Sequence, residues 1–200
     1  MTSVRVDRRE NTSKRAGAHT SIRTLLDEAG LKQRVRAVIR GEPDRVIEVY
    51  RKAHPEATPW DLYMLIGTDH PRGTYTRELA RRKAELGRAA AYLYRFDSET
   101  PVAPHLKTPH AIEIPFVFDN ISKSKASTGD APETHALAAK VSAAWVAFAK
   151  TGNPNTPQLP QWPAYSAASR DTMVFNHVSR VVKDPDREQR LIMEQVLKLT

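Results

Sequence analysis

Apolar residues recur at helical spacing through the first half of the chain. In residues 44–53, Val46, Ile47 and Tyr50 fall on one face, directly after a proline suited to a first helical turn. A strongly charged amphipathic pattern ends before Gly87, where a left-handed C-cap is favoured. The pattern therefore predicts a series of helices over residues 22–29, 31–39, 44–53, 60–66 and 74–86.

The period changes after residue 88. Residues 89–96 (AAAYLYRF) are almost continuously apolar, which is typical of a strand buried on both faces, and a second short strand is predicted at 172–176. Helical patterns return at 112–118, 132–150 and 185–199. Prolines and small polar residues indicate connections at 100–109, 123–130 and 153–163.

The longest predicted helix, 132–150, has a single apolar stripe. The stripe consists of Leu137, Val141, Ala144, Trp145 and Phe148. Because large aromatic side chains in such a stripe usually face a core, we expect Trp145 and Phe148 to be buried rather than to line a substrate site.

The strand inventory is small for the number of helices. A sheet of two strands is marginal alone, and a strand covered on both faces needs neighbours in its sheet. The sequence therefore predicts an α/β fold that is mostly helical, with two or three short strands and an incomplete central sheet.

The net positive charge suggests an alternative function, a binding module. The formal net charge of +8 would suit a basic helical binding module, between residues 31 and 87, for nucleic acid or an acidic partner. The basic residues of 74–86 alternate with Glu78 and Glu85, however, as on a solvated helix face. No motif typical of nucleic-acid readers is present, so a nucleic-acid partner is not expected.

The amino-acid composition excludes several kinds of site and several classes of protein. The chain has no cysteine, which excludes disulfides, a cysteine nucleophile and thiolate metal sites. It has no apolar run of about 18 residues, so no membrane span is expected. Residues 1–20 lack the apolar stretch of a signal peptide. We expect them to form a divergent, disordered segment ahead of one domain at 21–200. If Met1 is the true start, a cytoplasmic location is expected.

Candidate chemistry is concentrated in residues 108–120, TPHAIEIPFVFDN. His110 ends a proline-rich loop and precedes an apolar helix, and Glu113 lies three residues further on. Prolines that restrict such a loop can present an imidazole to a site while apolar neighbours anchor it. Taken alone, a histidine in a loop is more often a structural or surface residue.

Several motifs that occur in order along the chain favour a catalytic role for His110 over a structural one. His110, Ala111, Glu113 and Phe118 fit a His-small-x-Glu-x-x-x-x-Phe run. Residues 145–155 fit Trp-x-x-Phe-Ala-x-Thr-Gly-x-Pro-Asn, residues 162–165 fit Trp-Pro-x-Tyr, and residues 172–175 resemble a final strand. Together they resemble the C-terminal portion of type-B carboxylesterases, the α/β-hydrolase family that includes para-nitrobenzyl esterases and cholinesterases. The likeness runs from about residue 31 to the end.

The resemblance implies a Ser–acid–His hydrolase of small-molecule carboxylic esters that needs no cofactor. His110 corresponds to the base that takes the serine proton. The family's serine lies in a Gly-x-Ser-x-Gly elbow, but no two glycines of this chain are four residues apart. We therefore expect a fragment that is inactive alone, and a complementing N-terminal fragment would be its partner.

Two carboxylates are candidates to assist His110. Glu10 precedes it by the spacing expected of the triad acid, although a solvated terminal carboxylate is the alternative. Glu113 would tie down the histidine loop, or would simply compensate the helix N-terminus.

The other candidates are weaker. Trp60, Tyr63 and Met64 lie in the region that forms a lid in relatives, so they are candidates for the acyl pocket, with core packing as the alternative. The remaining histidines lack metal-ligand spacing with acidic residues, and no metal site is predicted.

Overall fold

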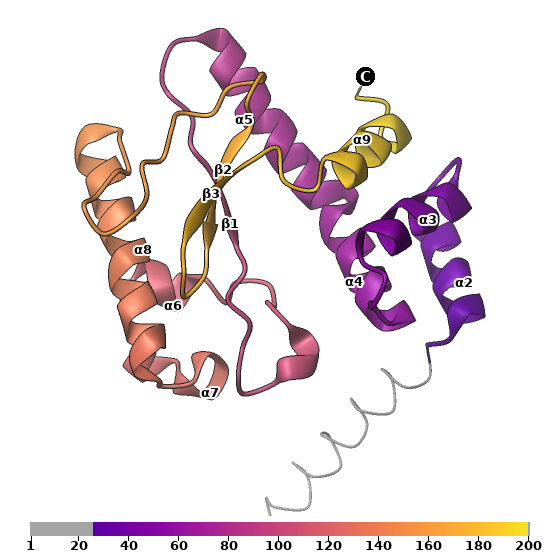
Figure 1. Ribbon diagram of the computed structural model, residues 1–200, viewed down its shortest axis with the longest axis horizontal. Coiled ribbons are helices and arrows are strands. Elements are labelled where there is room, and N and C mark those ends of the chain that lie inside the picture. The colour runs from indigo at the N-terminus through magenta and orange to yellow at the C-terminus, as the bar shows by residue number, and fades with distance from the viewer. Residues whose placement is uncertain (1–25, 200) are drawn as a thin grey trace, which may run out of the picture. The chain divides into compact units, whose positions relative to one another are not determined.

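The computed structural model describes residues 26–199, which form short helices and one small sheet (Figure 1). In the first part of the chain the elements are α2 (Glu28–Val38), α3 (Pro43–Ala53), α4 (Pro59–Thr68), the kink η1 (Asp69–Gly73) and α5 (Thr74–Leu86). They are followed by β1 (Leu93–Phe96), η2 (Pro104–Leu106), α6 (Ile114–Val117), η3 (Ile121–Lys123) and α7 (Lys125–Thr128). The last elements are α8 (Pro132–Thr151), β2 (Asp171–Phe175), β3 (Arg180–Lys183) and α9 (Arg187–Val196).

The chain divides into two compact units. Within the described residues, the first unit comprises 26–74 and 188–199, and the second comprises 75–187. Each unit has its own core of buried apolar side chains, so the two are described separately.

The first unit is helical, and local capping sets the helix starts. The Asp27 carboxylate accepts a hydrogen bond from the N–H of Gly30 (2.8 Å), which starts α2. Thr58 and Asp61 form a capping box at the start of α4, with Pro59 in the first turn. The prediction of one helix at 22–29 and a second at 31–39 is therefore wrong in part. Residues 26 and 27 lie outside any helix, and α2 runs without a break from Glu28 to Val38.

Apolar faces of α2, α3, α4 and α9 meet in the core of this unit. Leu31, Tyr50 and Leu62 are among its fully buried side chains. The Tyr50 hydroxyl donates a hydrogen bond to the Asp69 carboxylate (2.6 Å), so its polar end is satisfied although the ring is buried.

The second unit contains the sheet, with strand order β1–β2–β3. β1 pairs with β2 in parallel, with Phe96 opposite Phe175, and β2 pairs with β3 in antiparallel fashion. All of β2 is buried, because it has a neighbour on each side. β1 is only half-buried and starts at Leu93, so the prediction of a strand at 89–96 buried on both faces is wrong in these respects.

Helix α8 packs on the sheet through Leu137, Val141 and Ala144. It ends at Gly152, whose φ of 74° lies in the left-handed region that glycine adopts without strain. Trp145 and Phe148, which we expected in the core, are 42% and 37% exposed. Their rings contact side chains at and just before β1, the edge strand, and so receive less cover than side chains over β2.

Residues 123–130, predicted to be a surface loop, contain the short helix α7. The C=O of Ser124 accepts hydrogen bonds from the N–H groups of Ser127 (2.9 Å) and Thr128 (3.0 Å), and Thr128 is buried. The small polar residues here therefore form a tight helical turn rather than an open loop.

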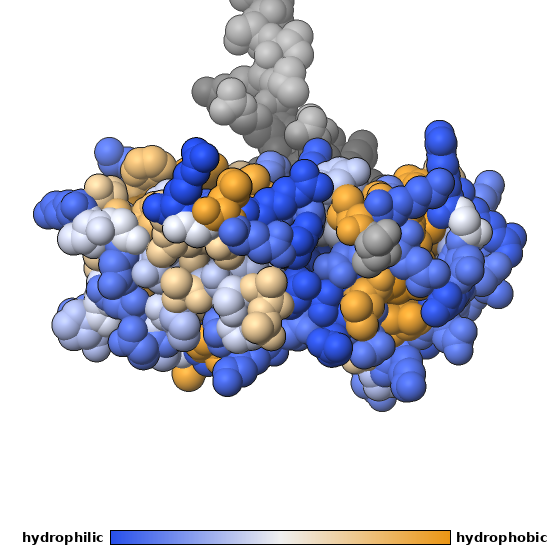
Figure 2. Space-filling model, turned by 90° about the horizontal axis from the view of Figure 1, so that it is seen from above, coloured by the Kyte–Doolittle hydropathy of each residue, from blue (hydrophilic) through white to orange (hydrophobic). Residues whose placement is uncertain are grey.

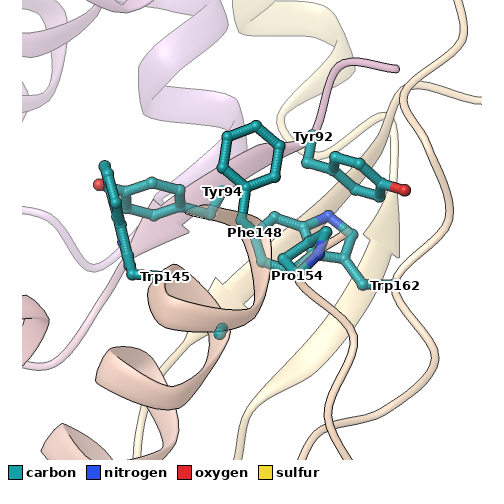
Figure 3. A pocket seen from close by; sticks show the side chains of 7 residues that line it. Tyr92, Tyr94, Trp145, Phe148, Pro154 and Trp162 are labelled. Atoms are coloured by element: carbon teal, nitrogen blue, oxygen red, sulfur yellow. The ribbon is translucent and has the colours of Figure 1, made fainter. Parts of the chain in front are cut away.

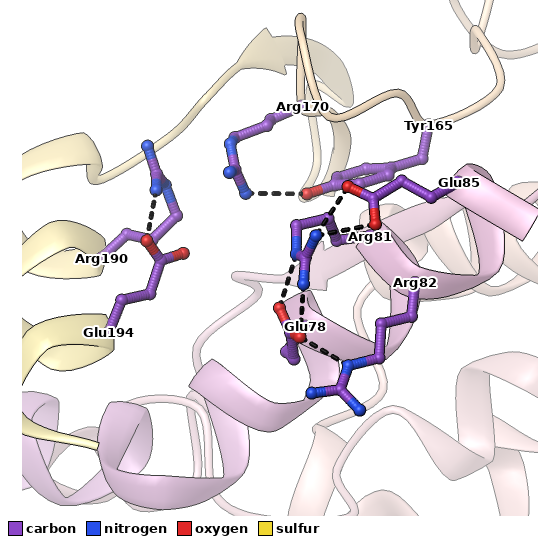
Figure 4. Close-up of polar contacts among 8 residues, drawn as sticks. All are labelled: Glu78, Arg81, Arg82, Glu85, Tyr165, Arg170, Arg190 and Glu194. Atoms are coloured by element: carbon purple, nitrogen blue, oxygen red, sulfur yellow. Dashed lines mark hydrogen bonds and ion pairs between the residues drawn. The ribbon is translucent and has the colours of Figure 1, made fainter. Parts of the chain in front are cut away.

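Polar residues cover much of the face shown in Figure 2, with apolar side chains exposed between them. The arginines of α5 are paired with acidic side chains: Arg81 binds both Glu78 (2.7 Å) and Glu85 (2.6 Å), and Arg82 binds Glu78 (2.6 Å) (Figure 4). The hydrogen bond from Arg81, aided by Arg82, lowers the pKa of Glu78 to about 2.

Candidate active site around His110

The loop that carries His110 is tied to the sheet where it leaves β1. The N–H of Asp97 donates to the C=O of Phe175 in β2 (2.9 Å), and the side-chain amide of Asn176 donates to the C=O of Asp97 (3.2 Å). Further along, the N–H of Thr100 donates to the C=O of Lys107 (2.9 Å). The loop therefore keeps a defined path after the strand ends.

Thr100 joins this loop to the segment after α7. Its side chain is buried, and its hydroxyl donates to the C=O of Ser127 and accepts from the N–H of Val102 (3.3 Å). Nearby, Gly129 has a φ of 70°, and a Cβ there would lie 2.8 Å from Pro101. Close packing of these two segments therefore depends on a buried hydroxyl and a missing side chain.

His110 itself begins a tight turn. The N–H of Ile112 donates to the C=O of Pro109 (3.1 Å), and Ala111 has a φ of 67°. Ile112 and Phe116 are buried, and the Phe116 ring lies 4.8 Å from that of Phe96 in β1. Buried side chains thus hold the turn on its inner side.

The imidazole of His110 is exposed, and it forms no hydrogen bond or ion pair with any residue in the described range 26–199. It follows the carboxyl end of a parallel strand, which is the edge where open α/β sheets bind their ligands. The order along the chain therefore fits a residue that contributes to such a ligand site. Glu10, the predicted triad acid, lies outside the described residues.

Glu113 lies in the same turn and is half-buried. Its backbone C=O accepts the N–H groups of Phe116 and Val117 (both 3.0 Å), but its carboxylate makes no capping hydrogen bond at α6. Burial, together with the negative charge of Glu113, raises the pKa of the Tyr94 phenol. The carboxylate is thus electrostatically coupled to β1, and its role beside His110 stays a prediction.

A group that the sequence analysis did not identify stabilises the end of β1. The Arg95 guanidinium forms two hydrogen bonds with the Asp97 carboxylate (2.7 and 2.8 Å) and also binds Asp186, just before α9. Such a bidentate pair restrains the residues from which the histidine loop departs. Asp97 follows Arg95 closely in sequence, but the 91-residue separation of Arg95 and Asp186 left no local signal.

The candidate acyl-pocket residues belong to the first unit. The rings of Trp60 and Tyr63 lie 6.1 Å apart, Tyr63 packs against the first core, and Met64 is exposed. Their part in an acyl pocket stays a prediction. Among the described residues, no group of three or more His, Cys, Asp or Glu side chains could hold a metal ion, and no helix is long and apolar enough to cross a membrane.

Comparison with known proteins settles the family. The sequence model of the carboxylesterase family matches residues 7–193 of the chain. The chain belongs to the carboxylesterase family. The resemblance seen in its motifs is thereby confirmed.

Two individual relatives support the family assignment. The para-nitrobenzyl esterase of Bacillus subtilis is 36% identical over 116 residues, which are 56% of this chain and 23% of that protein. The phenmedipham hydrolase of Pseudarthrobacter oxydans is 33% identical over 102 residues, 46% of this chain and 21% of that protein.

A solved carboxylesterase shares the fold as well. The enzyme from Geobacillus stearothermophilus, in its structure at pH 6.2, superposes with a TM-score of 0.72 at 34% identity. The match covers 91% of this chain and 37% of that one. The expected α/β-hydrolase fold is confirmed, and the chain spans less than two fifths of the length of these relatives.

Proposed function

We propose that this chain supplies the general base, His110, to a serine carboxylesterase that hydrolyses small-molecule carboxylic esters. The observation that carries the proposal is the position of His110. It is an exposed imidazole on a restrained turn, after the carboxyl end of a parallel strand, in a chain of the carboxylesterase family. The relatives named above include a para-nitrobenzyl esterase and a phenmedipham hydrolase, which supports the reaction class.

The chemistry assigned to His110 is proton transfer. The imidazole accepts the proton of a serine hydroxyl as the serine attacks the ester carbonyl, and then returns it to the departing alcohol. An acidic side chain would orient the imidazole and stabilise its protonated form, and Glu10 is the candidate for that role. The exposed face of His110 leaves room for both groups to approach.

The serine must come from residues outside this chain. No Gly-x-Ser-x-Gly pentapeptide is present, because no two glycines lie four positions apart. We therefore expect a complementing N-terminal carboxylesterase segment to be the partner, and we expect no ester hydrolysis by this chain alone.

A single-chain fusion tests the proposal. The part of the Geobacillus carboxylesterase that precedes the matched region (the N-terminal carboxylesterase segment) is joined ahead of the 200 residues. The fusion should hydrolyse p-nitrophenyl acetate or butyrate, and His110→Ala should lower kcat by about 10⁴-fold or more. His177→Ala, which removes another exposed histidine of the same unit, should leave kcat unchanged.

Two results would contradict the proposal. One is a fusion that hydrolyses neither ester, or whose turnover survives His110→Ala. The other is robust turnover by the isolated chain that disappears in His110→Ala, because it would require a nucleophile within these residues.

A further inference from the structure

Arg95 of β1 is held between two carboxylates. Its Nε donates to Oδ1 of Asp97 (2.7 Å), its Nη2 donates to Oδ2 of the same residue (2.8 Å), and its Nη1 binds Asp186. All three side chains are partly buried. Because the donors of a guanidinium lie in one rigid plane, Arg95 fixes both carboxylates relative to the strand.

The other face of β1 is held by aromatic packing. Side chains alternate along a strand, so Tyr94 lies on the face opposite Arg95. The Tyr94 ring contacts those of Trp145 and Trp162 (Figure 3), and it also contacts Phe175 of β2 at 5.5 Å between ring centroids. The end of the strand is thus held by rings on one face and by ion pairs on the other.

Asp97 is the first residue after β1, and each of its polar groups is bonded. Its N–H donates to the C=O of Phe175 (2.9 Å), and its C=O accepts from the side-chain amide of Asn176 (3.2 Å). Its carboxylate binds Arg95. These contacts fix the direction in which the chain leaves the strand.

Contacts between its two ends carry this restraint across the histidine loop. The C=O of the buried Ser98 accepts from the Thr108 hydroxyl (3.4 Å), and the N–H of Thr100 donates to the C=O of Lys107 (2.9 Å). The two ends of the loop therefore lie side by side, and His110 lies two residues after Thr108. The place of the imidazole consequently depends on how the end of β1 is held.

The backbone of Asp186 also points to a specific role for this cluster. Its φ of 55° lies in the left-handed region, which glycine adopts freely and other residues adopt at a cost. Asp186 binds Arg95 across a separation of 91 positions. Backbone conformations of this kind persist where the surrounding structure holds them, often near functional sites.

We infer that Arg95 is a positioning residue for His110, because its pairs with Asp97 and Asp186 hold the strand end from which the histidine loop is aimed. This inference rests on the proposed function, since it assigns Arg95 to the reaction of His110. Proton transfer requires the imidazole within hydrogen-bond distance of the hydroxyl, and a displacement of about 1 Å can lower the rate about 10²-fold.

Hydrogen exchange on the 200-residue chain tests the structural half of the inference. Arg95→Met should speed exchange at the N–H groups of Thr100 and Ile112 at least about tenfold, and the amides of β2 should keep their protection. The Ile112 N–H closes the turn that His110 begins. Because the Arg95 side chain is 39% exposed, its replacement opens no cavity in the core.

Kinetics of the single-chain fusion test the catalytic half. Arg95→Met should lower kcat by about 10- to 100-fold and leave KM unchanged, because a misplaced base weakens the transition state more than substrate binding. Arg95→Lys keeps the charge but not the planar fork, so it should restore part of the lost kcat. Asp186→Gly removes one carboxylate at a φ that glycine adopts freely, and it should lower kcat less than Arg95→Met.

Arg81→Met is the matched control. Arg81 also lies between two carboxylates, those of Glu78 and Glu85, but all three residues belong to α5 rather than to the histidine loop. This variant loses comparable ion pairs. It should leave kcat and the exchange of Thr100 and Ile112 unchanged.

The outcomes separate positioning from a general contribution to stability. The inference would be overturned if the N–H groups of Thr100 and Ile112 exchanged no faster in Arg95→Met, or if the β2 amides lost equal protection. It would also be overturned if Arg95→Met and Arg81→Met had the same kcat. A fusion that is inactive before any substitution would overturn the proposed function, whereas exchange in the chain alone reports on Arg95 independently of activity.

Discussion

His110 owes its position to residues that carry no chemistry themselves. Buried Ile112 and Phe116 anchor the turn, and the buried hydroxyl of Thr100 joins the preceding loop to the segment after α7. The motif around His110 was recognisable in the sequence. The contact from Thr100 to Ser127 was not, because it joins residues 27 positions apart and neither residue type distinguishes a buried hydrogen bond from a surface one.

Replacing the Thr100 hydroxyl tests this anchoring. Thr100→Val keeps the size of the side chain but leaves the C=O of Ser127 and the N–H of Val102 without that partner. We expect the free energy of unfolding to fall by about 1–3 kcal/mol, measured by urea denaturation. Thr100→Ser keeps the hydroxyl and should lose clearly less. Equal losses in the two variants would show that the hydroxyl contributes no more than the methyl group.

Single elements show both the strength and the limit of pattern recognition. Alternating charge along α5 predicted a solvated helix face. In the structure Arg81 pairs with Glu78 and Glu85, because partners three and four residues apart are adjacent on a helix, and the Glu78 side chain is only 12% exposed. The β1 region was interpreted as a strand buried on both faces because of its apolar run. In the described part of the chain β1 is a half-buried edge strand, since burial depends on neighbours that the run does not specify.

The α5 ion pairs predict a pH dependence. The pKa of Glu78 is lowered from its ordinary 4.5 to about 2, so its ionised form stabilises the fold above pH 4.5 and this stabilisation is lost as the pH falls towards 2. Glu78→Gln should therefore be less stable than the unsubstituted protein near neutral pH. The difference in unfolding free energy should shrink between about pH 7 and about pH 3 in urea titrations.

Glu48→Gln is the control for the pH dependence of the Glu78→Gln variant. Glu48 is an exposed residue of α3, and its substitution should have little effect at either pH. A Glu78→Gln difference that stays constant, or grows, as the pH falls would contradict the assigned role of the ionised carboxylate.

At the scale of the whole molecule, two cores divide the chain. One gathers α2, α3, α4 and α9, which come from both ends of the described sequence, and the other forms between the sheet and α8. The helices of the first core were predicted from their periodicity. That residues near the C-terminus complete this core was not predicted, because periodicity identifies an apolar face without identifying its partner.

A substitution in one core tests whether each unit is stabilised separately. Leu62→Ala removes a fully buried side chain of the first core and should destabilise that unit by about 2–5 kcal/mol. Native-state hydrogen exchange should become faster in α2 and α4 while β2 keeps its protection.

The exposed Leu79 offers a control for this experiment. Leu79→Ala on α5, where the side chain is 69% exposed, should change the stability by no more than about 0.5 kcal/mol. Equal loss of protection in α2 and β2 of the Leu62→Ala variant would instead mean that the two units unfold together.

The sequence alone indicated most of the helices, the family and the candidate base, because caps, apolar periodicity and ordered motifs are local and survive without knowledge of distant contacts. Tertiary structure decided which apolar residues are covered. Leu137 and Trp145 belong to the same helical stripe, yet Leu137 is buried in the second core, whereas Trp145, which contacts Tyr94 of β1, is 42% exposed. The physical reason is that burial is a property of the space around a side chain, which neighbours from other segments must fill.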